Sequence, residues 1–349
     1  MNIPGPGSAE RTSEALRAAH LYYIQNLTMD AIARELQISR SSVSRLIGFA
    51  RDSGLVEIRL HSPVDQLTQL QQQLHERFGL TAHIVPAGDA ATEIDRLERV
   101  ALSAARILTD FVDSTMVLGV AWGSTIASVS RHLTRKPVRN VQIVQLNGAG
   151  NAHTSGLVYA SEIIGRFGTA FSATVQQFPV PAFFDYPATK DALWRERSTA
   201  RVLAVQGRMN IALFGIGSPD AAVPSHVYAG GYLDREDYES LADSGVVGDI
   251  ATMFFRADGS CEGIPLNARS SGPDFSVLMK TQRRIAVVSG QAKLPALRGA
   301  VATGLITDLV VDEITEAAVR RRLRPLFRRF SLPPNQTTRL KQPNQSTQL

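Results

Sequence analysis

Cysteine and long apolar runs are both scarce in this 349-residue chain. The one cysteine, Cys261, excludes an intrachain disulfide and a cysteine-rich metal site, and we expect it to be structural. No stretch reaches the roughly eighteen uninterrupted apolar residues that a membrane-spanning helix needs. The opening residues, MNIPGPGSAERTSE, lack the basic and apolar segments of a secretory signal. These absences predict a cytoplasmic protein that has no membrane segment and holds no metal or other cofactor.

Basic residues outnumber acidic ones only because of the carboxy-terminal segment. The net charge is +5, yet residues 320–349 hold eight Lys and Arg residues and no acid, which leaves 29 basic against 32 acidic residues elsewhere. Global charge is therefore poor evidence for nucleic-acid binding. The run Arg320–Arg329 suits nonspecific DNA, an acidic partner or a solvated helix end. We favour the helix end, because Leu323, Leu326 and Phe327 have the character of packing residues.

Periodicity and composition divide the chain into four parts. Residues 11–61 are mostly helical by apolar spacing, and residues 62–80 carry leucines at helical intervals, as a connecting helix does. Residues 81–330 alternate short apolar runs with longer amphipathic segments, and residues 331–349 have the Pro, Gln, Asn and Thr content of a disordered tail. We therefore predict an α/β effector domain with a doubly wound, mostly parallel sheet, preceded by an all-α winged helix-turn-helix domain.

The predicted strands are the apolar runs that glycine or polar residues bound. They are Ala82–Val85, Met116–Val120, Val141–Leu146, Ala170–Gln176, Ile211–Gly215, Ala251–Phe255, Arg284–Val288 and Asp308–Val311. Predicted helices between or beyond them include Arg96–Phe111, Thr125–His132, Leu157–Phe167 and Glu316–Arg324.

Residues 28–59 have the pattern of a helix-turn-helix. Thr28 or Asp30 can cap a first helix and Ser39 a second, while Val43, Leu46 and Ile47 face inward. Short polar side chains and arginine at the start of a recognition helix suit base edges and phosphates in the major groove. We therefore predict DNA contacts from Thr28, Ser39, Arg40, Ser41, Ser42, Ser44 and Arg45. A helical bundle with a merely solvated polar face is the alternative.

Two features bear on how this segment would bind DNA. Residues 1–62 hold seven basic and six acidic residues, too little positive charge for tight monomer binding, so we expect dimerisation. The helix 67–78 can supply that contact or pack on its own effector domain. The break at Gly54, followed by Leu55–Leu60, predicts a small wing.

Glycine-marked turns follow several predicted strands, where open α/β sheets bind ligands. In LGVAWGST, the amides and hydroxyls of Gly123, Ser124 and Thr125 suit a phosphate or carboxylate, although Ser124 can also act as a plain helix cap. Asp249 can accept sugar hydroxyls or stabilise a turn. Lys293, in a first helical turn, is either paired with a bound anion or solvated.

The order of these elements resembles the SorC family of sugar-binding transcriptional regulators over residues 15–320. The matching segments are SRSSVSRLIGFARDSGLVEI, LGVAWGST, QLNGAG, ALFGIGSP, GVVGDIATMFF and GLITDLVVDEITEAAV. The resemblance implies a DNA-binding head joined to an effector domain similar to sugar-phosphate isomerases of the glucosamine-phosphate type. It also implies an operator DNA partner, a sugar, polyol or sugar-phosphate ligand, and a homo-oligomer, either dimer or tetramer.

The resemblance also implies roles for individual residues. Gly123, Ser124 and Thr125 would hold a phosphate or terminal hydroxyls, Asp249 would bind sugar hydroxyls, Lys293 would contact the anionic or carbonyl end, and Asn147 would line the same pocket. Before Lys293 this chain has Val288-Ser289-Gly290 where the family is expected to have a Gly-Gly turn. That departure leaves the phosphorylation of the ligand open.

A sugar-phosphate isomerase or deaminase with an accessory head is the alternative function. It requires an acid–base pair near the sugar. His153 and His226 lie near glycine-rich segments, but the sequence shows no tight carboxylate–histidine constellation. We therefore predict a regulator and not an enzyme, in which the ligand shifts the affinity for operator DNA.

Overall fold

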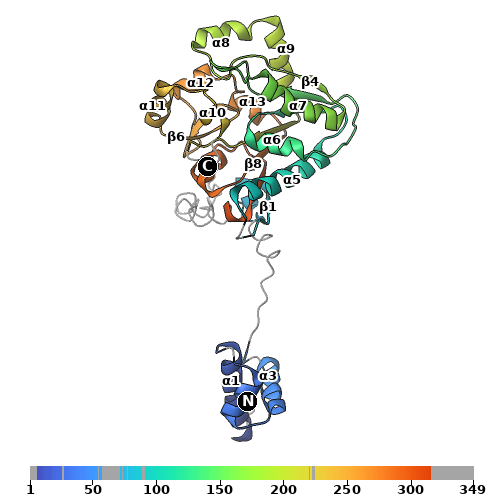
Figure 1. Ribbon diagram of the computed structural model, residues 1–349, viewed down its shortest axis with the longest axis vertical. Helices are drawn as coiled ribbons and strands as arrows, with labels where there is room; N and C mark the ends of the chain where they lie inside the picture. Colours follow the sequence, from blue (N-terminus) through green and yellow to red (C-terminus); the bar gives the residue numbers. More distant parts are fainter. Residues whose placement is uncertain are drawn as a thin grey trace, which may run out of the picture. The chain divides into compact units, whose positions relative to one another are not determined.

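The computed structural model describes residues 6–315, with side chains from Arg11 onward, except residues 26, 54, 57–70, 73, 77, 89–90, 220 and 222–224. The chain forms two compact units, Met1–Gln66 and Leu67–Leu349 (Figure 1). Several predicted segments lie outside the described residues: most of the wing, the first part of the connecting helix, the helix Glu316–Arg324, the run Arg320–Arg329 and the tail 331–349.

Three helices form the described part of the first unit, as the sequence predicts. They are α1 (Pro6–Tyr23), α2 (Met29–Leu36) and α3 (Arg40–Asp52). Apolar side chains at helical spacing meet between them in a small core made of Ala18, Leu21, Ile32, Val43 and Ile47.

The predicted helix caps are present in this unit. The Thr28 hydroxyl accepts a hydrogen bond from the Ala31 amide at the start of α2 (3.3 Å), and the Ser39 hydroxyl accepts one from the Ser42 amide at the start of α3 (3.1 Å). These bonds satisfy amides that have no partner within their own helix. The sequence therefore determines where both helices of the motif begin.

The second unit is built on a seven-stranded parallel sheet with the order β1-β9-β8-β5-β2-β3-β4. Its strands are β1 (Thr81–Val85), β2 (Val117–Val120), β3 (Gln142–Gln145), β4 (Thr174–Gln176), β5 (Ile211–Gly215), β8 (Arg283–Val288) and β9 (Asp308–Asp312). The predicted α/β class with a mostly parallel sheet is confirmed.

Two strand predictions are wrong in part. Helix α7 continues to Phe171, so the predicted strand Ala170–Gln176 begins only at Thr174. The run Ala251–Phe255 is not in the main sheet: β6 (Val246–Ile250) and β7 (Met253–Arg256) form a separate antiparallel pair. Ala251 and Thr252 make the turn of this hairpin, with φ values of 49° and 68°. Apolar composition alone did not separate a turn or a helix end from a strand.

Helices cover both faces of the main sheet, so it is doubly wound. Side chains of β8 alternate between two apolar clusters: Ile285 and Val287 belong to the cluster that includes residues of α5, α6 and α7, and Ala286 and Val288 to the cluster that includes residues of α9 and α14. The helices are α5 (Glu93–Phe111), α6 (Ser124–Arg131), α7 (Leu157–Phe171), α8 (Pro187–Trp194), α9 (Arg197–Gln206), α10 (His226–Ala229), α11 (Arg235–Asp243), α12 (Pro265–Arg269), α13 (Phe275–Met279), the 3-10 turn η1 (Gln291–Lys293) and α14 (Leu294–Ala302).

The strand order reverses between β2 and β5. From β2 the chain builds outward through β3 and β4, and then returns to the other side of β2 to add β5, β8 and β9. Ligands in open α/β sheets bind in the crevice outside the carboxyl ends of the strands at such a reversal. The topology therefore directs attention to the residues that follow β2 and β5.

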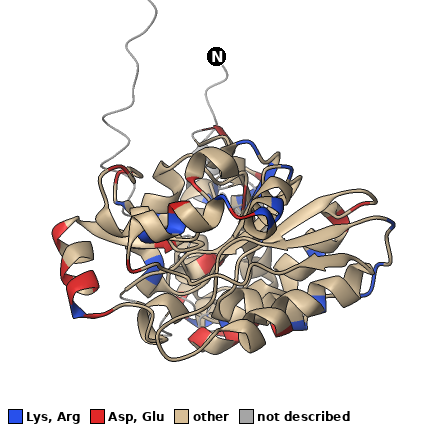
Figure 2. Cartoon of the chain, turned by 90° about the horizontal axis from the view of Figure 1, so that it is seen from above, with Lys and Arg blue, Asp and Glu red and all other residues tan. Residues whose placement is uncertain are grey.

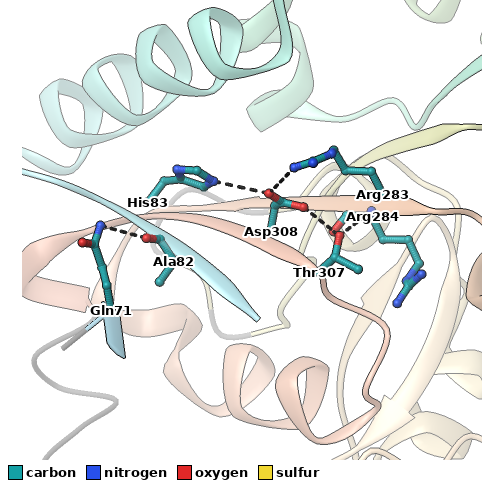
Figure 3. A network of polar contacts seen from close by, with 7 residues as sticks. All are labelled: Gln71, Ala82, His83, Arg283, Arg284, Thr307 and Asp308. Carbon is teal, nitrogen blue, oxygen red and sulfur yellow. Dashed lines mark hydrogen bonds and ion pairs between the residues drawn. The ribbon is translucent and has the colours of Figure 1, made fainter. Parts of the chain in front are cut away.

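The beginnings of the strands, at the opposite end of the sheet, carry a polar network (Figure 3). Asp308 Oδ1 lies 2.8 Å from Arg283 Nη1 and 3.4 Å from His83 Nε2, which joins β9 to β8 and β1. The Arg283 guanidinium also lies 3.6 Å from the centroid of the Phe111 ring. Because each of these charged groups has a partner, we interpret the network as structural. It holds β9 to β8 and β1.

Charged residues lie mainly on the helices and loops around the sheet (Figure 2). Strands β2, β3 and β5 contain none, because helices bury both of their faces. None of the described helices combines the length and the apolar character that crossing a membrane requires.

Candidate functional site

A cleft of about 450 Å³, including its open mouth, lies at the reversal of strand order. We call it the switch-point cleft. Its walls are residues 121–126 after β2, Asn147 after β3, residues 215–217 after β5, the β6–β7 hairpin and Lys293. All six residues predicted to bind an effector line it: Gly123, Ser124, Thr125, Asn147, Asp249 and Lys293. The fold thus brings these six residues, which come from four separate sequence segments, into one site, while the role of each residue remains a prediction.

The turn before α6 presents free backbone amides to the cleft. Gly123 is the residue before the helix, and its φ of 140° is a value that residues with a Cβ rarely adopt. No side chain caps α6, so the alternative in which Ser124 serves as the cap is wrong. The first amides of the helix, the Ser124 hydroxyl and the buried Thr125 are therefore available to oxygen atoms of a ligand.

Asp249 lies at the end of β6 with only 4% of its surface exposed. Burial raises the pKa of its carboxyl from 3.8 to about 6, although the Thr252 amide, which donates to Oδ2 at 3.1 Å, and the charge of Lys293 oppose that rise. Gly217 makes room for this carboxylate: a Cβ there would lie 1.8 Å from Asp249 Oδ1. The carboxylate is thus held against the backbone of the neighbouring loop.

Lys293 ends the turn η1 and is 8% exposed, so the alternative of a solvated surface lysine is wrong. Burial lowers the pKa of its ammonium, while the charges of Asp249 and Glu93 act in the opposite direction. The preceding turn is fixed from β9: the Gly290 amide donates to Asp312 Oδ2 (3.2 Å) and to Thr315 Oγ1 (3.1 Å). A buried cation thus lines the same cleft as the start of α6.

Trp122 lines the cleft but was not among the residues predicted from the sequence to bind a ligand. The Trp122 indole N–H donates to the carbonyls of Asn147 (3.1 Å) and Gly148 (2.8 Å), and its ring stacks on Tyr232 with 5.0 Å between centroids. His226 packs edge-on against Trp122 at 5.8 Å, and burial lowers the pKa of its imidazole. Trp122 stands inside the LGVAWGST segment, next to the residues that were singled out. Nothing in the local sequence of His226 indicates its place.

The two histidines considered for catalysis are separated in the structure. His226 lines the switch-point cleft, whereas His153 is exposed and lines a different groove. Within the described residues, no group of three or more His, Cys, Asp and Glu side chains could hold a metal ion. Cys261 is a free, half-buried thiol, and burial raises its pKa.

The residues predicted to contact DNA form one face of the first unit. Five of them are exposed at the start of α3, namely Ser39, Arg40, Ser41, Ser44 and Arg45, while Ser42 is half-buried and Thr28 is exposed before α2. Arg45 donates to the Ser42 hydroxyl at 3.3 Å. Arg40 lies 3.6 Å from Asp30 on α2, which offsets part of the positive charge of this face. Val43 and Ile47 are buried on the opposite side, as predicted.

Known proteins match both parts of the chain. Residues 62–319 match the domain family described as "Putative sugar-binding domain". The chain is 32% identical over 314 residues to the deoxyribonucleoside regulator of Bacillus subtilis, an alignment that covers 89% of this chain and 98% of that protein.

Two solved structures resemble the fold. A domain of a "possible sugar-binding transcriptional regulator" from Arthrobacter aurescens TC1 has 52% identity and a TM-score of 0.69, covering 74% of this chain and 99% of that one. The full-length sorbitol operon regulator SorC of Klebsiella pneumoniae has a TM-score of 0.67 and covers 88% of this chain and 98% of its own, at 23% identity, so it shows the fold alone. Because the matched domain spans more than half of the chain and the Bacillus protein aligns along nearly all of it, this chain belongs to the SorC family of sugar-binding transcriptional regulators.

Proposed function

We propose that the switch-point cleft binds a sugar, polyol or sugar phosphate, and that the bound ligand controls the affinity of the first unit for operator DNA. One observation carries the ligand part of this proposal: Asn147 Oδ1 is buried in the cleft and has no hydrogen-bond partner among the described residues. A buried acceptor without a partner costs free energy. A ligand rich in hydroxyl groups supplies the missing donor beside Asp249 and Lys293.

Each part of the cleft has a role in this proposal. Ser124, Thr125 and the first amides of α6 hold the terminal hydroxyls or a phosphate. The carboxylate of Asp249 accepts hydrogen bonds from sugar hydroxyls, and Lys293 donates to an anionic or carbonyl end. The ring of Trp122 supplies an apolar wall for the carbon skeleton.

On the DNA side, we propose that α3 enters the major groove with Arg40 and Arg45 toward the bases and phosphates. The near balance of charge in residues 1–62 favours a homo-oligomer, because two heads on one operator add their binding energies. The regulator acts in the cytoplasm and releases its ligand unchanged. The proposed control is linkage: a ligand that binds one arrangement of the oligomer more tightly shifts the population and thereby the operator affinity.

The test is fluorescence anisotropy of the full-length protein on DNA from upstream of its own gene, with a panel of free and phosphorylated sugars and polyols. We expect one ligand to change the operator Kd by about fivefold or more. Ser124→Ala and Lys293→Ala should lose this response while ligand-free DNA binding persists, and the exposed control Ser198→Ala should respond normally.

Three results would count against the proposal. If no ligand altered DNA binding, the control function would fail. If both cleft variants responded like the unmodified protein, the site would be wrong. If the protein bound no operator DNA and turned over a sugar phosphate, it would be an enzyme.

A further inference from the structure

A second cavity of about 360 Å³ shares lining residues with the switch-point cleft at the start of α6. We call it the side cavity. It shares Ser124, Thr125 and Lys293 with the cleft and adds Glu93, in the first turn of α5, and Ser289. The Ser289 hydroxyl is buried, and no described residue forms a hydrogen bond with it. A carboxylate therefore lines a cavity together with the elements that the sequence predicts to bind an anion.

The charges that line the two cavities do not favour an anion. Two carboxylates, Asp249 and Glu93, face one cation, Lys293, whose ammonium is electrostatically coupled to both. The one other titratable residue of the lining is His226, whose pKa is lowered by burial, so it is neutral at pH 7. Within the described residues, no arginine lines either cavity, and the sequence from 218 to 225 adds no base.

A phosphate ester carries a charge of about −1.5 to −2 at pH 7 and is ordinarily met by arginine or lysine together with backbone amides. Here it would share its lysine with two carboxylates, and the carboxylate of Glu93 would repel it. Hydroxyl groups suit the same lining better, because they donate to carboxylates and accept from an ammonium and from amides. The free Oδ1 of Asn147 and the hydroxyl of Ser289 are further neutral partners.

We propose that the ligand of this chain is an unphosphorylated sugar or polyol, and that Glu93 is the residue that selects against the phosphate ester. This inference rests on the proposed function of the cleft. Of the three ligand classes proposed above, it keeps sugars and polyols and excludes sugar phosphates.

Isothermal titration calorimetry of the full-length protein with matched pairs tests the inference. The probes are D-ribose and D-ribose 5-phosphate, D-glucose and D-glucose 6-phosphate, and D-sorbitol and D-sorbitol 6-phosphate. In the pair that binds, we expect the free member to bind at least about tenfold more tightly than its phosphate ester, and inorganic phosphate not to compete.

Glu93→Gln tests the role of the carboxylate. The variant should bind the phosphate ester more tightly and the free member less tightly, so that the preference narrows by about tenfold. Glu196→Gln, which removes the same charge from an exposed position outside both cavities, should keep the original preference. Circular dichroism melts of both variants check that the fold is intact.

The outcomes separate this inference from the proposed function. Tighter binding of a phosphate ester by the unmodified protein would overturn the inference and leave the proposed function standing. An unchanged preference in Glu93→Gln would overturn the assignment of Glu93. If no member of any pair bound, the proposed function of the cleft would fail together with the inference.

Discussion

The two units of this chain expose their predicted functional residues to opposite degrees. On α3 the side chains Arg40, Ser41 and Arg45 are exposed to solvent. In the switch-point cleft, Asn147 is 1%, Asp249 4% and Lys293 8% exposed. The α3 side chains are accessible to a large charged partner, whereas the cleft side chains are already desolvated in the folded protein.

The two units therefore differ in when their polar side chains lose water: on α3 when DNA binds, and in the cleft when the protein folds. Exposed arginines remain hydrated until DNA arrives, and they act through charge and counterion release. Buried polar groups have been desolvated during folding, so each hydrogen bond to a ligand is stronger and each missing partner is costlier. We therefore expect substitutions in the cleft to change the stability of the protein, and substitutions on α3 to change DNA affinity alone.

Replacing Lys293 with methionine should have the largest effect. It keeps the length of the side chain but removes the positive charge that favours the ionised form of the buried Asp249 carboxyl, a loss of about 3 kcal/mol. We expect Tm of the α/β unit to fall by roughly 10 °C in differential scanning calorimetry. Lys280→Met, at an exposed position, is the control and should leave Tm nearly unchanged. Equal decreases of Tm in the two variants would contradict the expected difference between a buried and an exposed charge.

The titration of Asp249 should appear in the pH dependence of stability. Its pKa is about 6 in the folded protein against an ordinary value of 3.8, so between these pH values the folded state holds a proton that the unfolded state has released. Stability should therefore fall as pH rises through this window, by about 3 kcal/mol in total, and Asp249→Asn should lack that fall.

Urea unfolding from pH 4 to 7 measures this difference. The free energy of unfolding of Asp249→Asn minus that of the unmodified protein should grow with pH and level off above about pH 6. Asp243→Asn, an exposed control on α11, should show no such trend. A constant difference across the range would mean that burial does not perturb Asp249.

On the exposed side of the comparison, Arg40→Ala and Arg45→Ala should each weaken operator binding by about tenfold, because each removes one contact to a base or phosphate. Neither should change Tm. Arg51→Ala removes the same charge from the last turn of α3 and is the control for nonspecific electrostatics. If all three variants lost affinity equally in fluorescence anisotropy, the specific role of the predicted face would be wrong.

The smallest expected effect is local. Thr28→Ala removes the hydroxyl that caps α2 and should cost about 1 kcal/mol. Hydrogen exchange measured by mass spectrometry should then be about fivefold faster in α2. Ser44→Ala, at an exposed position within α3, should leave that exchange rate as it is. No change in α2 would show that the cap contributes nothing to the stability of this unit.

Local sequence signals were sufficient for most of the fold. The caps at Thr28 and Ser39 and the uncharged runs of β2, β3 and β5 all involve neighbours in sequence. The run 251–255 misled the prediction because a buried hairpin has the same apolar composition as a sheet strand, and β6 was missed because its sequence, VVGDI, contains glycine and an acid. One helix also starts earlier than predicted: α5 begins at Glu93 and not at Arg96, because Thr92 and Asp95 form a capping box.

The site was predictable only in part. Five of its six predicted residues follow strands of the parallel sheet, so the ends of those strands had to lie at one edge of the sheet. The sixth, Asp249, lies in the separate β6–β7 hairpin. Trp122, His226 and Glu93 were not singled out as ligand contacts because their places depend on how loops and helices pack after the sheet forms. The exposure of Lys293 could not be read from its neighbours either, since the elements that bury it come from distant parts of the chain.

The hydrogen bonds that the Gly290 amide donates to Asp312 and Thr315 have a consequence for the order in which the parts of the protein form during synthesis. Asp312 and Thr315 hold the turn that carries Lys293, and they belong to the last strand of the sheet and the residues after it. A chain leaving the ribosome presents its amino-terminal unit first. The helices that carry the predicted DNA contacts are therefore made long before the proposed ligand site can be completed, so we expect a newly made copy to be able to contact DNA before it can bind a sugar.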